Sequence, residues 1–301
     1  MPPLPLPTSL SPSKVSTFKD CALAFRFSAI DKLPEPPSIP AIKGTTVHRA
    51  LEKLFADDPT DRTPDRAQEC LVDALAEMQT DEEYVGLELD AAAAEDFASD
   101  AARMVERYFE LEDPRAIVPV GLEMMLEADI DGLLVRGIID RLEEVDGELV
   151  VTDYKTGRAP SVAQEQSRLG GVHFYAFLCQ RVLGRIPSKV QLVYLGKQPQ
   201  VITTTPSEQS IRGMEKKIAA IWSAVERACE RDDFRPKQSA LCNWCSFKAY
   251  CPEFGGDPDE ARAFAIARDA ARDAERAAAE SDAAETVVVL GAADPAAAAT
   301  A

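Results

Sequence analysis

The stretch "VGLEMMLEADIDGLLVRGIIDRLEEVDGELVVTDYKTG", residues 120–157, decides the fold. Residues 118–157 have the pattern of successive strands, because short apolar and β-branched runs alternate with turn residues. The segment "VDGEL", residues 145–149, places Asp-Gly between two of these runs, which is a hairpin signal. The stretch therefore predicts neighbouring strands joined by a tight turn.

The end of this stretch carries an unusual set of charges. Side chains alternate along a strand, so Asp153 and Lys155 are expected on one face. Asp140 lies thirteen residues upstream, and the hairpin would bring it near Asp153. Two such carboxylates repel each other unless a cation lies between them, and Mg²⁺ or Mn²⁺ takes oxygen ligands of this kind. The other interpretation of Asp153 and Lys155 is a plain salt bridge at the end of a strand.

A metal with an ammonium beside it suits the hydrolysis of a phosphodiester. The metal polarises the phosphate and lowers the pKa of a bound water. The lysine can orient that water or stabilise the transition state. His48, in "KGTTVHRALEKLFA", is one of only two histidines and is expected on a helix that starts at Gly-Thr-Thr, where a threonine can cap the first turn. It could be a further ligand, although a lone helical histidine is more often structural.

The remaining chain predicts helices around this sheet. Residues 1–12 are expected to be a flexible arm, 13–27 a helix, 33–41 a proline-rich loop, and 57–113 an acidic, alanine-rich helical lobe. A helix, two strands and a long helix at 207–231 follow the central stretch, and 257–301 form an acidic, Ala-rich, partly disordered tail. The order indicates an α/β or α+β core with a helical lobe inserted before the sheet.

Bulk properties narrow the classes of function. The 301 residues suffice for one large domain or two ordinary ones, and a net charge of -18 argues against a surface coated in positive potential, though not against a local basic groove. No apolar run is long enough to span a bilayer. The Pro- and Ser-rich start lacks the pattern of a signal peptide, which favours a cytoplasmic protein.

The cysteines point to a second metal centre. Seven cysteines without a secretion signal argue against a disulfide framework. Three of them, in "CNWCSFKAYC", have the spacing C-x2-C-x5-C, and the candidate for a fourth ligand lies more than 200 residues upstream: Cys242, Cys245, Cys251 and Cys21. Zinc, a 4Fe–4S cluster and unliganded thiols remain open on spacing alone. The other three are interpreted as ordinary small buried or half-buried residues: Cys70, Cys179 and Cys229.

The motifs "GTTVHRALE", "GIIDRLE" and "VVTDYKTG", in this order, resemble the RecB-like branch of the PD-(D/E)XK nucleases. The resemblance covers roughly residues 10–255. It implies a restriction-endonuclease-like mixed sheet flanked by helices, a nuclease domain at 13–256 and an inserted helical lobe at 57–113. It also implies a metal site built from three side chains and one main-chain oxygen: His48, Asp140, Asp153 and the carbonyl of Tyr154.

The same resemblance assigns further residues. Lys155 would be the catalytic lysine, and Glu123 stands on the strand where members often carry a glutamate, although a plain surface acid is equally compatible. Of the family's Q-x-x-x-Y helix motif, Tyr175 is present as a DNA-contacting candidate, but Gly171 replaces the glutamine. Arg141 can either touch a phosphate or pair with an acid.

One group of RecB-like nucleases, which includes AddB-type helicase–nuclease subunits and CRISPR-associated adaptation nucleases, has one cysteine before the nuclease motifs and three after them, holding a 4Fe–4S cluster. Cys21 and the segment 242–251 match that placement, so the resemblance favours iron–sulfur over zinc. Such a cluster would fasten the two ends of the domain together.

These observations predict a Mg²⁺- or Mn²⁺-dependent DNA exonuclease that acts on single strands or ends in repair or recombination, alone or beside a helicase. The alternative is a noncatalytic DNA-binding or scaffolding module stapled by the cluster. A hydrolase for another phosphodiester would keep the metal site, but no P-loop favours it.

Overall fold

The computed structural model describes residues 3–291, without the side chains of 162–170, 275 and 277–291. A mixed five-stranded sheet forms its centre, with the strands in sequence order. The third and fourth strands are parallel and all other neighbours are antiparallel. The strands are β1 (Pro119–Ile130), β2 (Leu133–Val145), β3 (Glu148–Lys155), β4 (Lys189–Tyr194) and β5 (Gln200–Thr204). The expected α/β architecture, a mixed sheet flanked by helices, is confirmed.

Two Asp-Gly turns connect the first three strands. Asp146 and Gly147 have φ values of 52° and 79°, and Asp131 and Gly132 have 52° and 85°. Positive φ at both central residues is what a two-residue hairpin of the favoured twist requires, and Asp-Gly tolerates it best. The predicted turn in "VDGEL" is confirmed, and a second turn of the same kind joins β1 to β2.

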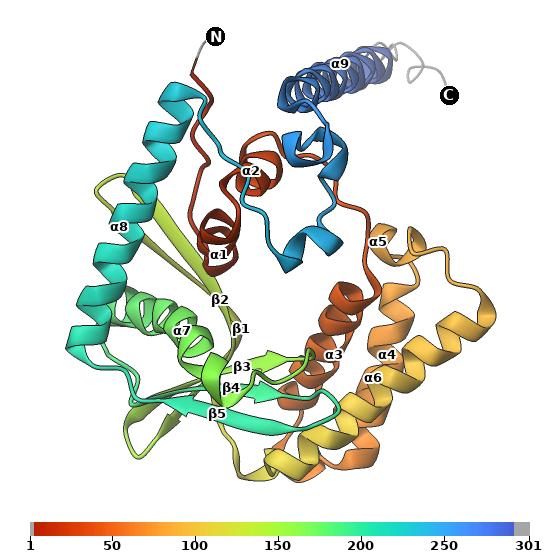
Figure 1. Cartoon of the computed structure of the whole chain (residues 1–301). Helices are drawn as coiled ribbons and strands as arrows, with labels where there is room; N and C mark the ends of the chain where they lie inside the picture. Colours follow the sequence, from red (N-terminus) through yellow and green to blue (C-terminus); the bar gives the residue numbers. More distant parts are fainter. Residues whose placement is uncertain (1–2, 292–301) are drawn as a thin grey trace, which may run out of the picture.

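Helices cover both faces of the sheet (Figure 1). One cluster of buried side chains joins one face of the sheet to a first group of helices, which are the N-terminal helices, α7 and α8, and to the cysteine segment. A second cluster joins the opposite face to a second group of helices, which form the helical lobe. The first group comprises α1 (Pro12–Asp20), α2 (Ala22–Phe25), a π-helical turn (Arg26–Ile30), α7 (Val162–Leu183) and α8 (Glu208–Arg231). The second comprises α3 (Ile39–Ala56), α4 (Pro64–Met78), α5 (Glu82–Val85), α6 (Ala91–Leu111) and 3-10 turns at Pro59–Asp61 and Pro114–Ala116.

The start of α3 corrects the sequence prediction. The helix begins at Ile39, inside the expected proline-rich loop, and Ser38 caps it by accepting a hydrogen bond from the N–H of Ala41. Pro40 is tolerated because the first-turn N–H groups have no partner within the helix. No threonine caps this helix: the Thr46 hydroxyl donates to the Ile42 carbonyl inside it. His48 therefore lies in the middle of α3, where its position is well fixed.

The N-terminal segment also differs from expectation. Residues 3–12 were expected to be flexible, but Leu10 is fully buried and bridges to Val135 in β2. The Leu10 N–H donates to the Leu134 carbonyl, and its own carbonyl accepts from the Arg136 N–H. Because β3 pairs with β2 only from Arg141 onward, this edge of β2 would otherwise lack partners.

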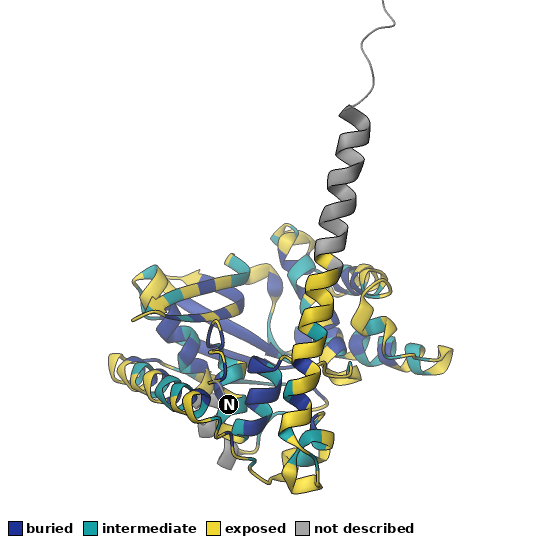
Figure 2. Cartoon of the chain, turned by 90° about the horizontal axis from the view of Figure 1, so that it is seen from above, coloured by how far each residue is buried: buried dark blue, intermediate teal, exposed yellow. Residues whose placement is uncertain are grey.

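The C-terminal part completes the first layer. Three 3-10 turns carry the cysteine segment: Ala240–Trp244, Lys248–Tyr250 and Pro252–Phe254. The helix α9 (Pro258–Gly291) follows and is largely exposed over its described side chains (Figure 2). The low-complexity segment 292–301, expected to be disordered, lies outside the described residues. Within residues 3–291, no helix combines enough length and apolar character to cross a bilayer.

Candidate active site

The end of β3 carries the predicted acid and lysine. Lys155 Nζ forms an ion pair with Asp153 Oδ2, and the two side chains are 43% and 4% exposed. Tyr175 on α7 donates its hydroxyl to the other oxygen of Asp153 at 3.2 Å. Burial, followed by the charge of Asp153, raises the pKa of Tyr175, which keeps the phenol a proton donor. Asp153 is thus held from both sides.

Asp140 and His48 approach the backbone of β3 from two other elements. Asp140 Oδ2 accepts a hydrogen bond of 2.6 Å from the Tyr154 N–H and lies 3.5 Å from His48 Nδ1. The His48 Nε2 lies 3.1 Å from the Tyr154 carbonyl. The structure therefore brings together His48, Asp140 and the main chain of Tyr154, which the sequence placed on three separate segments.

Glu123 joins this group. One ligand atom from each of His48, Glu123 and Asp140 lies within 4.8 Å of the others, which no other set of three such residues achieves among the described side chains. In the register of β1 and β2, Leu122 pairs with Arg141 and Met124 with Ile139, so Glu123 stands opposite Asp140.

The backbone of Glu123 is unusual. Its φ of 42° lies in the left-handed region. For a residue with a Cβ atom, this conformation costs about 1 kcal/mol or more. Strain of this kind concentrates at functional sites, and here it falls on a strand residue that turns a carboxylate toward another acid.

The acids of this group repel each other. Burial, then the charge of Asp153, raises the pKa of Asp140 to about 6. Burial, then the charge of Asp140, raises the pKa of Glu123 to about 7. A divalent cation would relieve this repulsion. Two carboxylates and an imidazole with their ligand atoms this close fit Mg²⁺ or Mn²⁺ through the oxygens, with the imidazole better suited to Mn²⁺.

Arg141 pairs with acids, which is one of the two roles expected for it. Its side chain is fully buried and pairs with Glu112 at 2.9 Å and Glu143 at 2.8 Å. It also donates to the Tyr154 hydroxyl at 2.6 Å and lies over the Phe55 ring. A guanidinium without exposed surface cannot reach a DNA phosphate, so the DNA-contacting interpretation of Arg141 is wrong. Glu112 could not be predicted as a partner of Arg141 from the sequence, because nothing in a local pattern marks an acid after a helix as the partner of a distant strand residue.

The second histidine of the chain, His173, lies on α7. His173 is half-buried, and burial, followed by the charge of Lys217, lowers its pKa. Gly171, which stands at the glutamine position of the helix motif, is exposed. Tyr175 is therefore the motif residue for which the structure shows a contact with the site.

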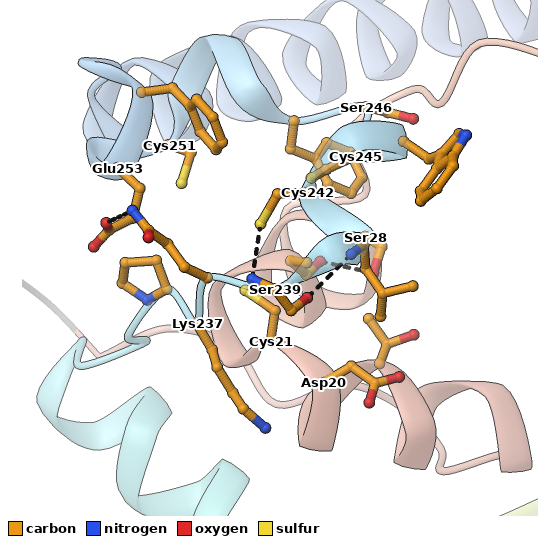
Figure 3. A pocket seen from close by; sticks show the side chains of 18 of the residues that line it. Asp20, Cys21, Ser28, Lys237, Ser239, Cys242, Cys245, Ser246, Cys251 and Glu253 are labelled. Atoms are coloured by element: carbon orange, nitrogen blue, oxygen red, sulfur yellow. Dashed lines mark hydrogen bonds between the residues drawn. The ribbon is translucent and has the colours of Figure 1, made fainter. Parts of the chain in front are cut away.

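The four predicted cluster cysteines line one cavity of about 250 Å³ (Figure 3). Cys21 lies between α1 and α2, and the others come from the segment after α8: Cys242, Cys245 and Cys251. The predicted burial of the remaining cysteines is confirmed: Cys70, Cys179 and Cys229 are buried.

The spacing of the cavity's sulfur atoms bears on what they could hold. A zinc ion with Zn–S bonds of about 2.3 Å keeps tetrahedral sulfurs about 3.8 Å apart. Among the described residues, no three cysteine sulfurs lie within 4.8 Å of one another. The arrangement is therefore more open than a zinc tetrahedron. Figure 3 shows the four side chains around the cavity that they line.

Several known proteins are similar to this chain. A curated protein of Mycobacterium phage D29, named Gene 69 protein, is 25% identical over 265 residues, which are 81% of this chain and 96% of that protein. The Gene 69 protein of Mycobacterium phage L5 is 27% identical over 146 residues, 48% of this chain and 47% of that protein. A crystal structure from Eubacterium rectale that carries the name of an exonuclease aligns with 79% of this chain and 87% of its own, with a TM-score of 0.47 and 9% identity.

A family model extends over the whole sheet. It matches residues 9–252, from the segment that bridges to β2 to the last of the clustered cysteines. Its description is the PD-(D/E)XK nuclease superfamily, whose members generally use divalent metal ions. The match covers the strands and helices that carry His48, Asp140, Asp153 and Lys155. The chain therefore belongs to the PD-(D/E)XK nuclease superfamily.

Proposed function

We propose that this nuclease is a Mg²⁺- or Mn²⁺-dependent deoxyribonuclease with its active centre at the end of β3, beside the middle of β2. The observation that carries the proposal is the convergence of ligand atoms from His48, Glu123 and Asp140 within 4.8 Å. The ion pair of Lys155 and Asp153 lies on the adjoining strand. Asp153 and the Tyr154 carbonyl would complete the ligand set, with Glu123 as an additional ligand.

The residues around the centre have distinct tasks. A bound divalent ion supplies the positive charge that polarises a phosphodiester and makes a water more acidic. Asp140 and His48 both contact the Tyr154 main chain, which fixes their orientation relative to β3. Tyr175 donates to Asp153 and holds that carboxylate in place. These contacts preorganise the donor set before substrate arrives.

Lys155 acts as a cation in this scheme. Burial alone would lower its pKa, but the charges of Asp153 and Asp140 outweigh burial and raise it. A protonated ammonium at this position can orient the attacking water or stabilise negative charge on the transferring phosphoryl group. It is therefore assigned to charge stabilisation rather than to proton abstraction.

The finer features of the proposal rest on the motif resemblance. We propose exonuclease action on single strands or DNA ends, a role in repair or recombination, a cytoplasmic location, and action alone or beside a helicase. We also propose that Cys21, Cys242, Cys245 and Cys251 hold a 4Fe–4S cluster, with zinc as the lesser candidate. The cavity that the four cysteines share supports a common metal centre.

The decisive experiment compares Lys155→Ala with Lys216→Ala, an exposed lysine on α8. Both proteins are assayed on labelled single-stranded and duplex DNA with Mg²⁺ or Mn²⁺. We expect Lys155→Ala to lose roughly 100-fold or more in cleavage rate while thermal melting shows that it remains folded, and Lys216→Ala to match the wild type. Equal cleavage by Lys155→Ala would refute the catalytic assignment. DNA binding by the wild type without any cleavage would favour the noncatalytic module.

A further inference from the structure

A second cavity opens directly beyond the catalytic strand. It measures about 650 Å³ and lies between α3, α6, the residues that follow β3 and the turn that joins β4 to β5. Figure 1 shows α3 and α6 beside the ends of β3 and β4. Thr156, which lines the cavity, immediately follows Lys155. The cavity therefore begins one residue from the proposed catalytic lysine.

The lining of this cavity has the opposite charge to the protein as a whole. The chain has a net charge of -18, yet five cationic side chains and a single carboxylate line the space. The cations are Lys43, Arg103, Arg107, Arg158 and Lys197, and the carboxylate is Asp100. Low-dielectric walls around one sign of charge concentrate the electrostatic field, so a cavity of this kind attracts anions.

The cations differ in how far their charge is neutralised. Lys43 and Arg103 both pair with Asp100, and therefore share one negative charge. Arg107 on α6 donates to the Leu195 carbonyl at 3.4 Å, which leaves its charge uncompensated by any carboxylate described here. Arg158 and Lys197 are exposed, and no described acidic side chain lies within ion-pair distance of either. Their charges are available to a ligand.

The loops that present these two cations are held close together. A Cβ atom on Gly196 would lie 2.6 Å from the Gly157 carbonyl oxygen, so the two backbones pack directly on each other. A Cβ atom on Gly44 would lie 3.1 Å from the Thr156 hydroxyl, so α3 also packs closely against the segment that follows β3. The position of Arg158 and Lys197 relative to Lys155 is therefore set by backbone packing.

We propose that this cavity, built jointly by the helical lobe and the nuclease sheet, binds the phosphate backbone of a single nucleic-acid strand on its way to or from the catalytic centre. The inference rests on the proposed nuclease function and extends it to the substrate strand. The volume lies within the range of pockets that enclose small ligands, roughly 300–1,000 Å³, which suits one or two nucleotides of one strand rather than a duplex.

The test removes the two uncompensated loop charges with the variant Arg158→Ala/Lys197→Ala. The matched control is Arg212→Ala/Lys216→Ala, which also removes one exposed arginine and one exposed lysine, but from α8. Binding of a short fluorescent single strand is measured by anisotropy on the full chain in EDTA over a series of salt concentrations. Thermal melting verifies that both variants fold like the wild type.

We expect the cavity variant to bind the strand roughly tenfold more weakly at low salt. Its plot of log affinity against log salt should be less steep by about 1.4, since each single-strand phosphate contact contributes about 0.7. The control should reproduce the wild-type affinity and slope. With metal, the cavity variant should show a raised KM at little-changed kcat. Equal affinities and slopes for the cavity variant and the control would overturn the proposal.

Further outcomes distinguish single-strand binding from duplex binding, from phosphate binding and from failure of the nuclease mechanism. Equal competition by a duplex of the same sequence would overturn the single-strand assignment. Competition by millimolar inorganic phosphate as effective as that of the oligonucleotide would mean that the site takes a free or terminal phosphate, and would overturn the backbone assignment. If Lys155→Ala cleaves like the wild type while the cavity variant still loses salt-dependent binding, the nuclease mechanism fails and the strand-binding cavity stands.

Discussion

Asp140 of β2 accepts a 2.6 Å hydrogen bond from the backbone N–H of Tyr154 in β3. The carbonyl of the same residue lies 3.1 Å from the His48 imidazole. One peptide segment therefore orients two side chains that come from different elements. Replacing the Tyr154 side chain would not remove these contacts, because they use the main chain. This explains how a strand position can order a metal site while its own side chain packs in the core.

Glu123 should contribute to metal binding. Substitution by Gln removes one negative charge from a group of three ligand atoms that lie within 4.8 Å of one another. We expect Glu123→Gln to weaken Mn²⁺ affinity roughly 10- to 100-fold, with a parallel loss of cleavage at limiting metal that high metal partly restores. Calorimetric titration with Mn²⁺ measures the affinity. Glu127→Gln, an exposed acid on the same strand, serves as the control and should bind like the wild type.

The pKa of Asp140 predicts a pH-dependent stability. Its pKa is raised to about 6 in the folded protein, against about 3.9 in an unfolded chain. Between these values the folded state binds more protons than the unfolded state, so the contribution of Asp140 to stability falls as pH rises from about 4 to about 6. Without metal, Asp140→Asn should therefore be more stable than the wild type at about pH 8, by roughly 1–2 kcal/mol, and lose most of this gain at about pH 4.

Denaturant unfolding in EDTA at both pH values measures this difference. Saturating Mn²⁺ should reverse the order at the higher pH, because metal binding stabilises only the protein with intact ligands. A gain in stability that is independent of pH, or larger in acid, would contradict the assignment of charge repulsion at Asp140.

The buried arginine predicts a large effect on stability. Arg141 is fully buried and its guanidinium pairs with Glu112 and Glu143. Glu112→Ala should leave part of that charge unpaired and lower the free energy of unfolding by roughly 3 kcal/mol. The control Glu106→Ala removes an exposed acid from α6 and should change it by less than about 0.5 kcal/mol. Urea unfolding curves compare the three proteins, and equal midpoints would show that Glu112 is dispensable.

The sequence predicted the parts of this protein that local rules govern. Asp146-Gly147 specifies its turn through backbone conformation alone, and the alternation of β3 places Asp153 and Lys155 on one face. The start of α3 was missed because Pro40 was interpreted as a loop signal, although proline is compatible with a first helical turn.

Long-range relationships were beyond such rules. Nothing near Leu10 in the sequence reveals that an edge of β2 needs a partner. The ion pair of Arg141 with Glu112 joins residues that are neighbours only after the lobe has packed on the sheet. The cationic cavity likewise combines charges from α3, α6 and two loops, none of which forms a basic run in the sequence.

The cysteine cavity leads to the last prediction. Cys21 lies in a shared cavity with Cys242, Cys245 and Cys251, whereas Cys70 is buried in the helical lobe. If the four hold a 4Fe–4S cluster, anaerobically purified wild type should be brown, with about four irons per chain. Cys21→Ser should lose most of that iron, while Cys70→Ser should retain it.

The cluster would link α1 and α2 to the segment after α8, so its loss should also lower the melting temperature. Closing a loop of more than 200 residues restricts mainly the unfolded chain, and a tie of this kind contributes several kcal/mol. Because the active-centre residues come from other elements, Cys21→Ser should keep metal-dependent cleavage at temperatures where it remains folded. Zinc in place of iron would overturn the cluster assignment, and iron retained at the wild-type level in Cys21→Ser would exclude Cys21 as a ligand.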